Sequence, residues 1–279
     1  MTEIDFDPDG YEECLVTFLD ILGFQSLLNT RTVPEIRDML SAFRRGAAGN
    51  AEAPSRMDEV RLYSEVHAEI VSDAIVRTRT VHTQYRDGSF IQELIDLVHV
   101  QIACIANGIL VRGAMTIGQM NVGYSFDEPV FGPGLVQAYR MEEREVIFPR
   151  IAIHESLIER HRADSSLWRE DHTYDHEREH LDKLLRQDEA GLHYIDYLRA
   201  SLDELDNDYE DWVEFLSRHK ALIEQGFLEA PGPVVRRKYN WLKNYHNRVV
   251  EEALAVMDPN VVTDEDVSWF DLISACLID

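Results

Sequence analysis

The chain has 279 residues, 45% of them apolar and 28% charged, which is an ordinary balance for one large globular domain. Its net charge of -25 argues against a broad surface for nucleic acid or for an anionic membrane, because both present negatively charged phosphates. No run of about 18 apolar residues predicts a membrane span, and the acidic N-terminus lacks the apolar segment of a signal peptide. We therefore expect a cytoplasmic protein with no nucleic-acid or membrane partner.

Apolar runs and turn residues predict alternating strands and helices along the chain. The first predicted strand ends at Asp20, and the step Ile21–Phe24 opens into a helix. The predicted strands are Leu15–Leu19, Val66–Val71, Ala74–Thr78, Leu110–Ile117, Asn121–Tyr124, Pro149–Ile153 and Gly191–Leu198. The predicted helices are Val33–Arg45, Ser89–Asn107, Leu135–Arg144 and Val234–Met257, and we expect helices throughout the chain after Ser201.

This order of elements, β-α-β-β-α-β with extra strands and then helices, fits a ferredoxin-like α+β sheet with helices on one face. It does not fit a Rossmann fold, and no Gly-x-Gly-x-x-Gly motif follows a strand. We assign the sheet domain to residues 1–200, with a polar excursion from the core near residues 160–188. Residues 201–279 are predicted to form a helical C-terminal extension.

Two aspartates, Asp20 and Asp73, each lie between apolar residues at the end of a predicted strand. In a β-α-β-β sheet the end of the first strand lies next to the turn between the second and third strands, so we expect the two to be neighbours. A buried carboxylate is costly unless it is paired or binds a cation, and two carboxylates suit Mg²⁺ or Mn²⁺. Each aspartate alone has an ordinary role as a cap or turn residue, whereas the pair in this topology indicates a two-metal site.

The residues after Asp20 also suggest a role in binding phosphate. The backbone N–H groups of Leu22, Gly23 and Phe24 are predicted to lie at a helix N-terminus, which favours anions. Gly23 has no side chain and allows a ligand to approach the backbone closely.

The segments Phe-Leu-Asp-Ile-Leu-Gly-Phe (residues 18–24), Ser72–Asp73 and Gly134–Met141 resemble the metal-binding pair and the arginine-bearing helix of class III nucleotidyl cyclases. The resemblance spans roughly residues 14–155. It implies a homodimer with shared active sites, in which the ribose 3′-hydroxyl of a nucleoside triphosphate attacks the α-phosphate and pyrophosphate leaves. The implied metal ligands for two Mn²⁺ or Mg²⁺ ions are Asp20, the Ile21 carbonyl and Asp73, and Arg140 would stabilise charge on the phosphates from the partner protomer.

The same resemblance implies a set of substrate-binding residues, in which this chain departs from the family. The set comprises Phe18, Leu22, Gly23, Phe24, Glu69, Pro129 and Val136. The asparagine that orients the ribose in the family falls on Val136, and one of the two base-reading positions falls on Pro129, which has no hydrogen-bonding side chain. The other base-reading position is Glu69, where guanylyl cyclases usually carry Glu and adenylyl cyclases Lys.

These departures and the C-terminal helical stretch resemble the pyrimidine nucleotide cyclases of bacterial anti-phage signalling, the Pycsar type. That resemblance implies synthesis of cyclic UMP or cyclic CMP, with UTP favoured, and a separate effector protein that reads the product. Two alternatives remain open: a guanylyl or adenylyl cyclase, of which Glu69 supports the guanylyl form, and a catalytically dead cyclase-like domain that binds nucleotide, which Val136 supports.

Four further features have structural explanations. His172, His176 and His180 are spaced for one helical face, which we interpret as solvated rather than metal-binding. Arg112 is expected to form a salt bridge, although it could reach a phosphate. The cluster Arg236–Lys238 is typical of a solvated surface, and Trp241 with Tyr245 and Val249 predicts a packing face.

Overall fold

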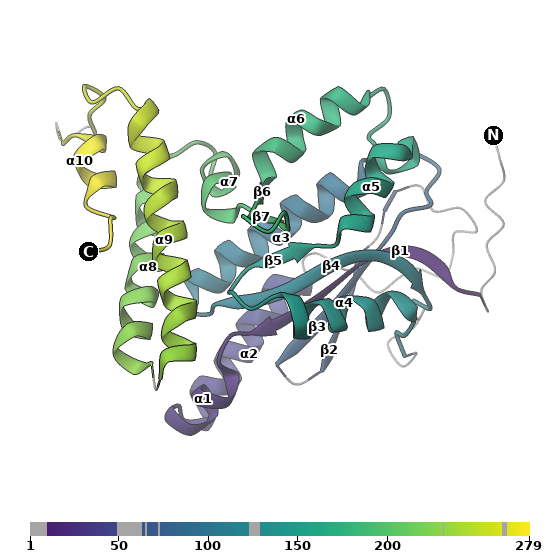
Figure 1. Cartoon of the computed structure of the whole chain (residues 1–279), viewed down its shortest axis with the longest axis horizontal. Helices are drawn as coiled ribbons and strands as arrows, with labels where there is room; N and C mark the ends of the chain where they lie inside the picture. Colours follow the sequence, from purple (N-terminus) through teal and green to yellow (C-terminus); the bar gives the residue numbers. More distant parts are fainter. Residues whose placement is uncertain are drawn as a thin grey trace.

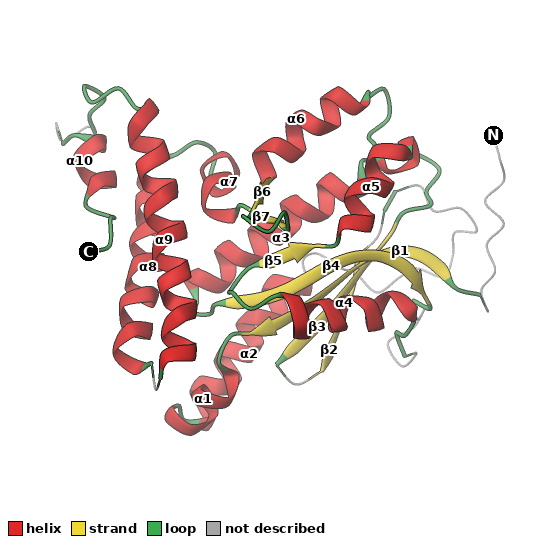
Figure 2. Cartoon of the chain, viewed as in Figure 1, coloured by secondary structure: helices red, strands yellow, loops and turns green. Residues whose placement is uncertain are grey.

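The computed structural model describes residues 10–48, 63–64, 66–71, 73–122, 129–230, 232–263 and 267–279. The described part is a twisted mixed sheet with helices packed around it (Figures 1 and 2). The predicted α+β fold is therefore confirmed.

The strands form a seven-stranded sheet in the order β2-β3-β1-β4-β5-β7-β6. Each pair of neighbours is antiparallel except β4 and β5, which are parallel. The strands are β1 (Glu12–Ile21), β2 (Val66–Val71), β3 (Ala74–Thr80), β4 (Val111–Met120), β5 (Ile151–Ile153), β6 (Leu185–Gln187) and β7 (His193–Ile195). The two strands predicted at Pro149–Ile153 and Gly191–Leu198 are thus shorter than expected. Of the strand predicted at Asn121–Tyr124, Asn121 forms an isolated bridge to Phe131, and residues 123–124 lie outside the described residues.

The described helices include all four long helices that the sequence predicts. They are α1 (Phe24–Thr30), α2 (Val33–Ala48), α3 (Ser89–Ala106), α4 (Pro133–Glu145), α5 (Glu155–Ala163), α6 (Tyr174–Leu184), α7 (Tyr197–Glu204), α8 (Tyr209–Glu229), α9 (Pro233–Val256) and α10 (Trp269–Ser274). Among the described helices, α3 has the length and composition of a membrane span, and 61% of it is buried inside the protein.

Helices cover both faces of the sheet, so the expectation of helices on one face is wrong in this detail. Leu15 and Leu19 of β1 join the core cluster formed with α2 and α3, whereas Val16 and Phe18 pack on the other face with α4. Alternate residues of a strand point to opposite faces, and β1 is apolar at both sets of positions. A continuous apolar run is typical of a strand that is covered on both faces.

Two glycines allow α4 to lie close against the sheet. A Cβ atom on Gly118 of β4 would lie 2.7 Å from the Cα of Gly134 in α4, and one on Gly134 would lie 3.0 Å from Val16. Any larger side chain at these positions would push α4 away from β1 and β4. The position of α4 matters because it carries Val136 and Arg140.

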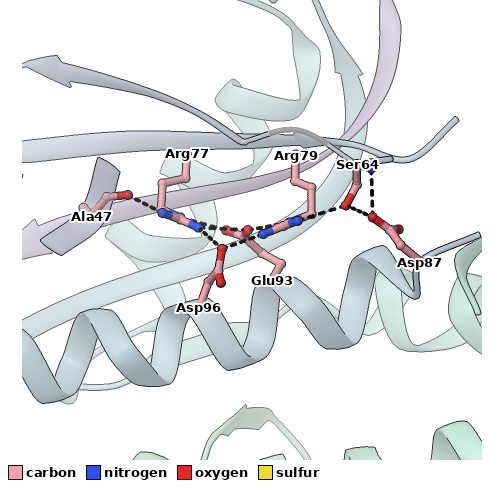
Figure 3. Close-up of polar contacts among 7 residues, drawn as sticks. All are labelled: Ala47, Ser64, Arg77, Arg79, Asp87, Glu93 and Asp96. Atoms are coloured by element: carbon pink, nitrogen blue, oxygen red, sulfur yellow. Dashed lines mark hydrogen bonds and ion pairs between the residues drawn. The ribbon is translucent and has the colours of Figure 1, made fainter. Parts of the chain in front are cut away.

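A buried network of charged side chains joins β3 to α3 (Figure 3). Arg77 and Arg79 of β3 both donate hydrogen bonds to Glu93 of α3, at 2.9 Å from each Nε, and both also reach Asp96. Arg79 continues the network to the hydroxyl of Ser64. The network fixes α3 beneath the same strands that carry the candidate site on their opposite face.

The segment predicted as a polar excursion near residues 160–188 is largely exposed, but a few buried side chains and its strand join it to the sheet domain. Its strand β6 is one of the two edge strands of the sheet, and α6 packs against α3. His161 and Glu177 are both fully buried and lie 3.2 Å apart. These two polar side chains can be buried because they find each other across 16 residues.

Among the C-terminal helices, α8 packs against α3 and against α9, and α10 packs against α8 and α9. Figure 1 shows this group at the left of the molecule. Trp212 of α8 and Tyr245 of α9 belong to the same core cluster as the sheet. Tyr245 and Val249 are buried and Trp241 is partly buried, so the packing face predicted from their spacing is confirmed.

Candidate active site

The candidate site lies where β1 ends beside the turn between β2 and β3. Asp20 of β1 is in register with Ala74, the first residue of β3, and the amide of Ile21 donates a hydrogen bond to the carbonyl of Asp73 at 3.3 Å. The two aspartates are therefore brought together from positions far apart in the sequence, as expected from the strand order.

The two carboxylates influence each other. The pKa of Asp20 is raised to about 6, first because the side chain is partly buried and second because the negative charge of Asp73 is close. Arg112 opposes both effects without cancelling them. Two acids that share one site without enough positive charge form an arrangement that binding a cation would relieve.

An ion pair on the neighbouring strand supports Asp20. Arg112 of β4 lies opposite Asp20 in the sheet, with Nη2 3.5 Å from Oδ2 of Asp20 and 2.5 Å from Oε1 of Glu142. Its Nη1 donates a hydrogen bond to the carbonyl of Val146 at 3.3 Å. The expected salt bridge of Arg112 is confirmed, and its acidic partners are now identified.

Glu142 is a residue of this site that the sequence did not reveal. It is 3% exposed and lies on the face of α4 that packs on the sheet. Burial raises its pKa, and so does Asp20, while Arg112 lowers it. The helical spacing could have revealed it, because Glu142 lies two residues after Arg140 and therefore on the opposite side of the helix.

Of the backbone N–H groups of Leu22, Gly23 and Phe24 that are expected to bind phosphate, the first is already hydrogen-bonded within the protein. The amide of Leu22 donates to the carbonyl of Leu110 at 2.8 Å, so this amide is already engaged within the protein. The ladder between β1 and β4 simply continues one residue further than expected. Gly23 has a positive φ of 74°, is exposed, and has no atom within 4 Å of the position of a Cβ. The side chain of Phe24 is buried in the core.

A second group of predicted residues gathers on the same face of the sheet. Glu69 of β2 pairs with Val76 of β3, and Val76 pairs with Phe18 of β1, so these three residues form one row across the strands. The carboxylate of Glu69 accepts a hydrogen bond from the amide of Val130 at 3.2 Å, which places Pro129 next to it. Phe18 is two residues from Asp20 and faces the same side.

Arg140 and Val136 lie on the outer side of α4, away from the sheet. Both are exposed, and both line a pocket of about 380 Å³ on the surface of the helix. The other residues that line this pocket are Pro133, Gln137, Met141, Glu145 and His154. Glu142, which contacts the Asp20 cluster through Arg112, is on the opposite side of the helix. Within one chain, therefore, Arg140 does not point toward the two aspartates.

The donor set at Asp20 and Asp73 fits a divalent cation. Two carboxylates and the carbonyl of Ile21 supply oxygen ligands, and Mg²⁺ commonly binds through one or two carboxylates while phosphates and waters complete its shell. Among the described residues, no group of three or more His, Cys, Asp or Glu has a metal-binding arrangement. Of the three histidines, His176 and His180 are exposed, whereas His172 is half-buried with Nδ1 2.7 Å from Oε1 of Glu177.

Comparison with known proteins identifies similar solved structures, while no family model and no curated protein matches the chain. The catalytic core of a rhodopsin-guanylyl cyclase with converted specificity, in complex with ATPαS, is 16% identical at a TM-score of 0.41, over 54% of this chain and 82% of that one. The guanylyl cyclase domain of the RhoGC fusion protein from the aquatic fungus Blastocladiella emersonii is 13% identical at a TM-score of 0.39, over 67% and 96%. A bacterial light-regulated adenylyl cyclase is 18% identical at a TM-score of 0.36, over 57% and 47%. These neighbours are class III nucleotidyl cyclases, and at such TM-scores the likeness does not assign a function to this chain.

Proposed function

We propose that this protein is a metal-dependent nucleotidyl cyclase that converts a pyrimidine nucleoside triphosphate, UTP in preference to CTP, to the 3′,5′-cyclic monophosphate and pyrophosphate. The observation that carries the proposal is the adjacency of Asp20 and Asp73 at the end of β1. Phe18 and Glu69 lie in one row on the same face of the sheet, two residues before Asp20 along β1. This row offers a place for the base.

Asp20, Asp73 and the carbonyl of Ile21 would hold two Mg²⁺ or Mn²⁺ ions. When bound, such ions activate the attacking 3′-oxygen and neutralise charge on the phosphates. The chain's own part is to hold the two carboxylates in place. Arg112 does so for Asp20, because it is itself fixed by Glu142 and by the carbonyl of Val146.

A homodimer would complete the site. Arg140 points away from the aspartates of its own chain, so it would act on the phosphates bound by a second copy. There its guanidinium would stabilise the charge that develops as the bond from the α-phosphorus to the bridging oxygen breaks. Exposed apolar side chains on and near α4, including Val136, Tyr139 and Phe131, offer a surface for that contact.

The preference for a pyrimidine follows from the base end of the site. A carboxylate only accepts hydrogen bonds, and one oxygen of Glu69 is already used by the amide of Val130. Its other oxygen suits a single donor such as N3–H of uracil. Pro129 adds no hydrogen-bonding side chain, so the wider edge of guanine would be recognised less completely. The N–H donors of guanine nevertheless keep a guanylyl cyclase as the second candidate.

The test is to incubate the purified protein with MnCl₂ and each of ATP, GTP, CTP and UTP separately, and to identify products by mass. A cyclic monophosphate from UTP, with less or none from CTP, would support the proposal. A product from GTP or ATP alone would replace it with a purine cyclase. Binding of a nucleotide without any product would support the catalytically dead alternative.

The metal assignment has its own variants. We expect Asp73→Ala to abolish turnover while leaving the fold intact, because Asp73 lies in a turn at the edge of the core. Isothermal titration of the Asp73→Ala protein with Mn²⁺ should show that binding of the metal is lost as well. The matched control is Glu143→Ala, an exposed acid on α4, which should change neither activity nor metal binding. Substantial activity of the Asp73→Ala protein with Mn²⁺ would contradict the assignment.

We further propose that the cyclic nucleotide is a second messenger in bacterial anti-phage defence and that a separate effector protein reads it. Measurement of cyclic UMP in cells that express the protein, before and after phage infection, tests this role. An unchanged level after infection, from an enzyme that is active when purified, would retain the cyclase and reject the defence role.

A further inference from the structure

Three histidines gather at the start of α6, and the proposed function uses none of them. The ring centre of His172, which precedes the helix, lies 5.5 Å from that of His176 and 5.9 Å from that of His180. The ring planes of His172 and His180 are within 2° of parallel. The spacing in the sequence favours a solvated face, but the fold brings one half-buried ring between two exposed ones.

A buried carboxylate fixes the orientation of His172. Glu177 is 1% exposed, and its Oε1 lies 2.7 Å from Nδ1 of His172. The same oxygen accepts a hydrogen bond from the amide of Arg169 at 3.1 Å, and Oε2 lies 3.2 Å from Nε2 of His161. Three N–H groups thus converge on one carboxylate, which holds the His172 ring from inside the protein.

This contact decides which nitrogen of His172 is available to a ligand. A carboxylate only accepts hydrogen bonds, so Nδ1 of His172 donates to Glu177 and the lone pair of the neutral ring is on Nε2. Nε2 is on the other side of the ring from the carboxylate. Histidines that bind metals have this arrangement, in which one ring N–H donates to a carboxylate and the other nitrogen is the ligand.

His176 has a different task. Its Nδ1 accepts a hydrogen bond from the amide of Thr173 at 3.4 Å, which closes the capping box of α6. In this tautomer Nε2 carries the proton, so neither nitrogen offers a lone pair to a metal. Residues 176–180 also read His-Glu-x-x-His, the pattern in which metalloproteases bind zinc and use the glutamate as a base. Here that histidine caps the helix and Glu177 is bound inside the protein, so the motif does not have the protease arrangement.

The geometry points to a binding site for one late first-row divalent metal ion, held by Nε2 of His172 and the imidazole of His180. Two imidazoles bound to one metal at about 2.1 Å have ring centres about 5 to 6.5 Å apart, and the two rings are 5.9 Å apart. His180 is exposed, so its ring can turn a nitrogen toward the ion while water completes the coordination. Imidazole favours Cu²⁺, Ni²⁺ and Zn²⁺, with Cu²⁺ bound most tightly, whereas Mg²⁺ prefers oxygen ligands.

Isothermal titration of the purified protein with CuCl₂ tests the site, with MgCl₂ in excess to occupy the carboxylates of Asp20 and Asp73. We expect one Cu²⁺ per chain at this site. Loss of a second-shell partner alone typically weakens metal binding about 10- to 100-fold, so removal of a ligand in His172→Gln or His180→Gln should weaken it about 100-fold or more. The matched control is His176→Gln, which changes another exposed histidine of the same helix and keeps a residue that suits the capping box. It should bind Cu²⁺ as wild type does.

Two further readouts show that the bound ion is ligated by these histidines. Electron paramagnetic resonance of the bound Cu²⁺ should show coupling to two nitrogens in wild type and in His176→Gln. Cu²⁺ should raise the melting temperature of these two proteins and not that of His180→Gln, because a ligand that binds only the folded state stabilises it. Melting temperatures without metal show that each variant is folded.

Three results would overturn the inference: no Cu²⁺ binding by wild type, equal affinity in wild type and a folded His180→Gln protein, or a loss in His176→Gln as large as that in His180→Gln. None of these measurements depends on whether the protein cyclises a nucleotide. The metal site and the proposed function therefore stand or fail separately.

Discussion

Glu93 shows what a single charged residue contributes to the core. It is 1% exposed and receives hydrogen bonds from both Arg77 and Arg79. Burial alone would raise its pKa, but the two arginines outweigh burial and lower it, so Glu93 is ionised. The cost of burying three charges is thereby offset by well-formed hydrogen bonds.

Removing the charge of Glu93 should therefore destabilise the protein. In Glu93→Gln, both arginines remain buried with only the partly exposed Asp96 as a charged partner. We expect a loss of about 3 kcal/mol in the free energy of unfolding, as is typical when one partner of a buried ion pair is removed. Urea unfolding followed by circular dichroism measures it.

The control is Glu143→Gln on α4, where the side chain is 54% exposed and lies 4.0 Å from Arg144. Exposed pairs of this kind contribute little, so its stability should equal that of wild type. A Glu93→Gln protein as stable as wild type would mean that water or Asp96 compensates the two arginines.

At the scale of elements, the pair of helices α8 and α9 encloses two histidines with no exposure to solvent. His219 and His246 stack with ring centres 5.1 Å apart, and their Nδ1 atoms are 3.0 Å apart. Nε2 of His246 donates to the carbonyl of Cys276, so its Nδ1 accepts from His219 and both rings are neutral. Burial lowers the pKa of His219 well below its usual value and that of His246 to about 4.

This packing should make the C-terminal helices sensitive to acid. In the unfolded chain a histidine has a pKa of about 6.5, so between pH 6.5 and 4 the unfolded state binds protons that the folded state does not. Stability is therefore lost as pH falls below about 6.5. For His246 we expect a loss of about 2 kcal/mol between pH 7 and pH 5, measured by urea unfolding at each pH. The difference in the free energy of unfolding between pH 7 and pH 5 should be smaller for His246→Gln than for wild type. The control His180→Gln, at an exposed position, should show the wild-type difference.

At the scale of the whole molecule, the central feature is the separation of the two halves of the candidate site. Asp20 and Asp73 lie on the sheet, whereas Arg140 lies on the outer surface of α4. A monomer would leave Arg140 without a phosphate to bind. A dimer of the proposed kind would contain two sites, each made from both chains.

Mixing variants tests this arrangement. Arg140→Ala and Asp20→Ala should each be inactive alone, and a mixture should regain part of the activity. One of the two composite sites is intact in each heterodimer, so statistical exchange restores about a quarter of wild-type activity. The measurement is the rate of cyclic nucleotide formation after the two proteins are mixed, with subunit exchange verified by native mass spectrometry of differently tagged chains. No recovery despite exchange would contradict a shared site.

The sequence by itself was sufficient for the strand that ends at Asp20, the turn at Asp73, the order of the central elements and the adjacency of the two carboxylates. These features depend on local pattern: apolar runs define strands, turn residues end them, and the order of strands constrains which ends meet. The expected roles of Arg140, Glu69 and Val136 remain proposals, because they depend on a bound nucleotide and a second chain.

Only the tertiary structure decided the rest. The side on which α4 packs, the hydrogen bond that occupies the amide of Leu22, and the burial of His161 with Glu177 all depend on contacts between segments distant in sequence. The same holds for Lys238, which is expected to lie in a solvated basic cluster but is half-buried in the structure. Whether a charged residue is exposed, paired or free to bind a ligand depends on which side chains the fold brings to within a few ångströms of it, and local sequence carries no record of those partners.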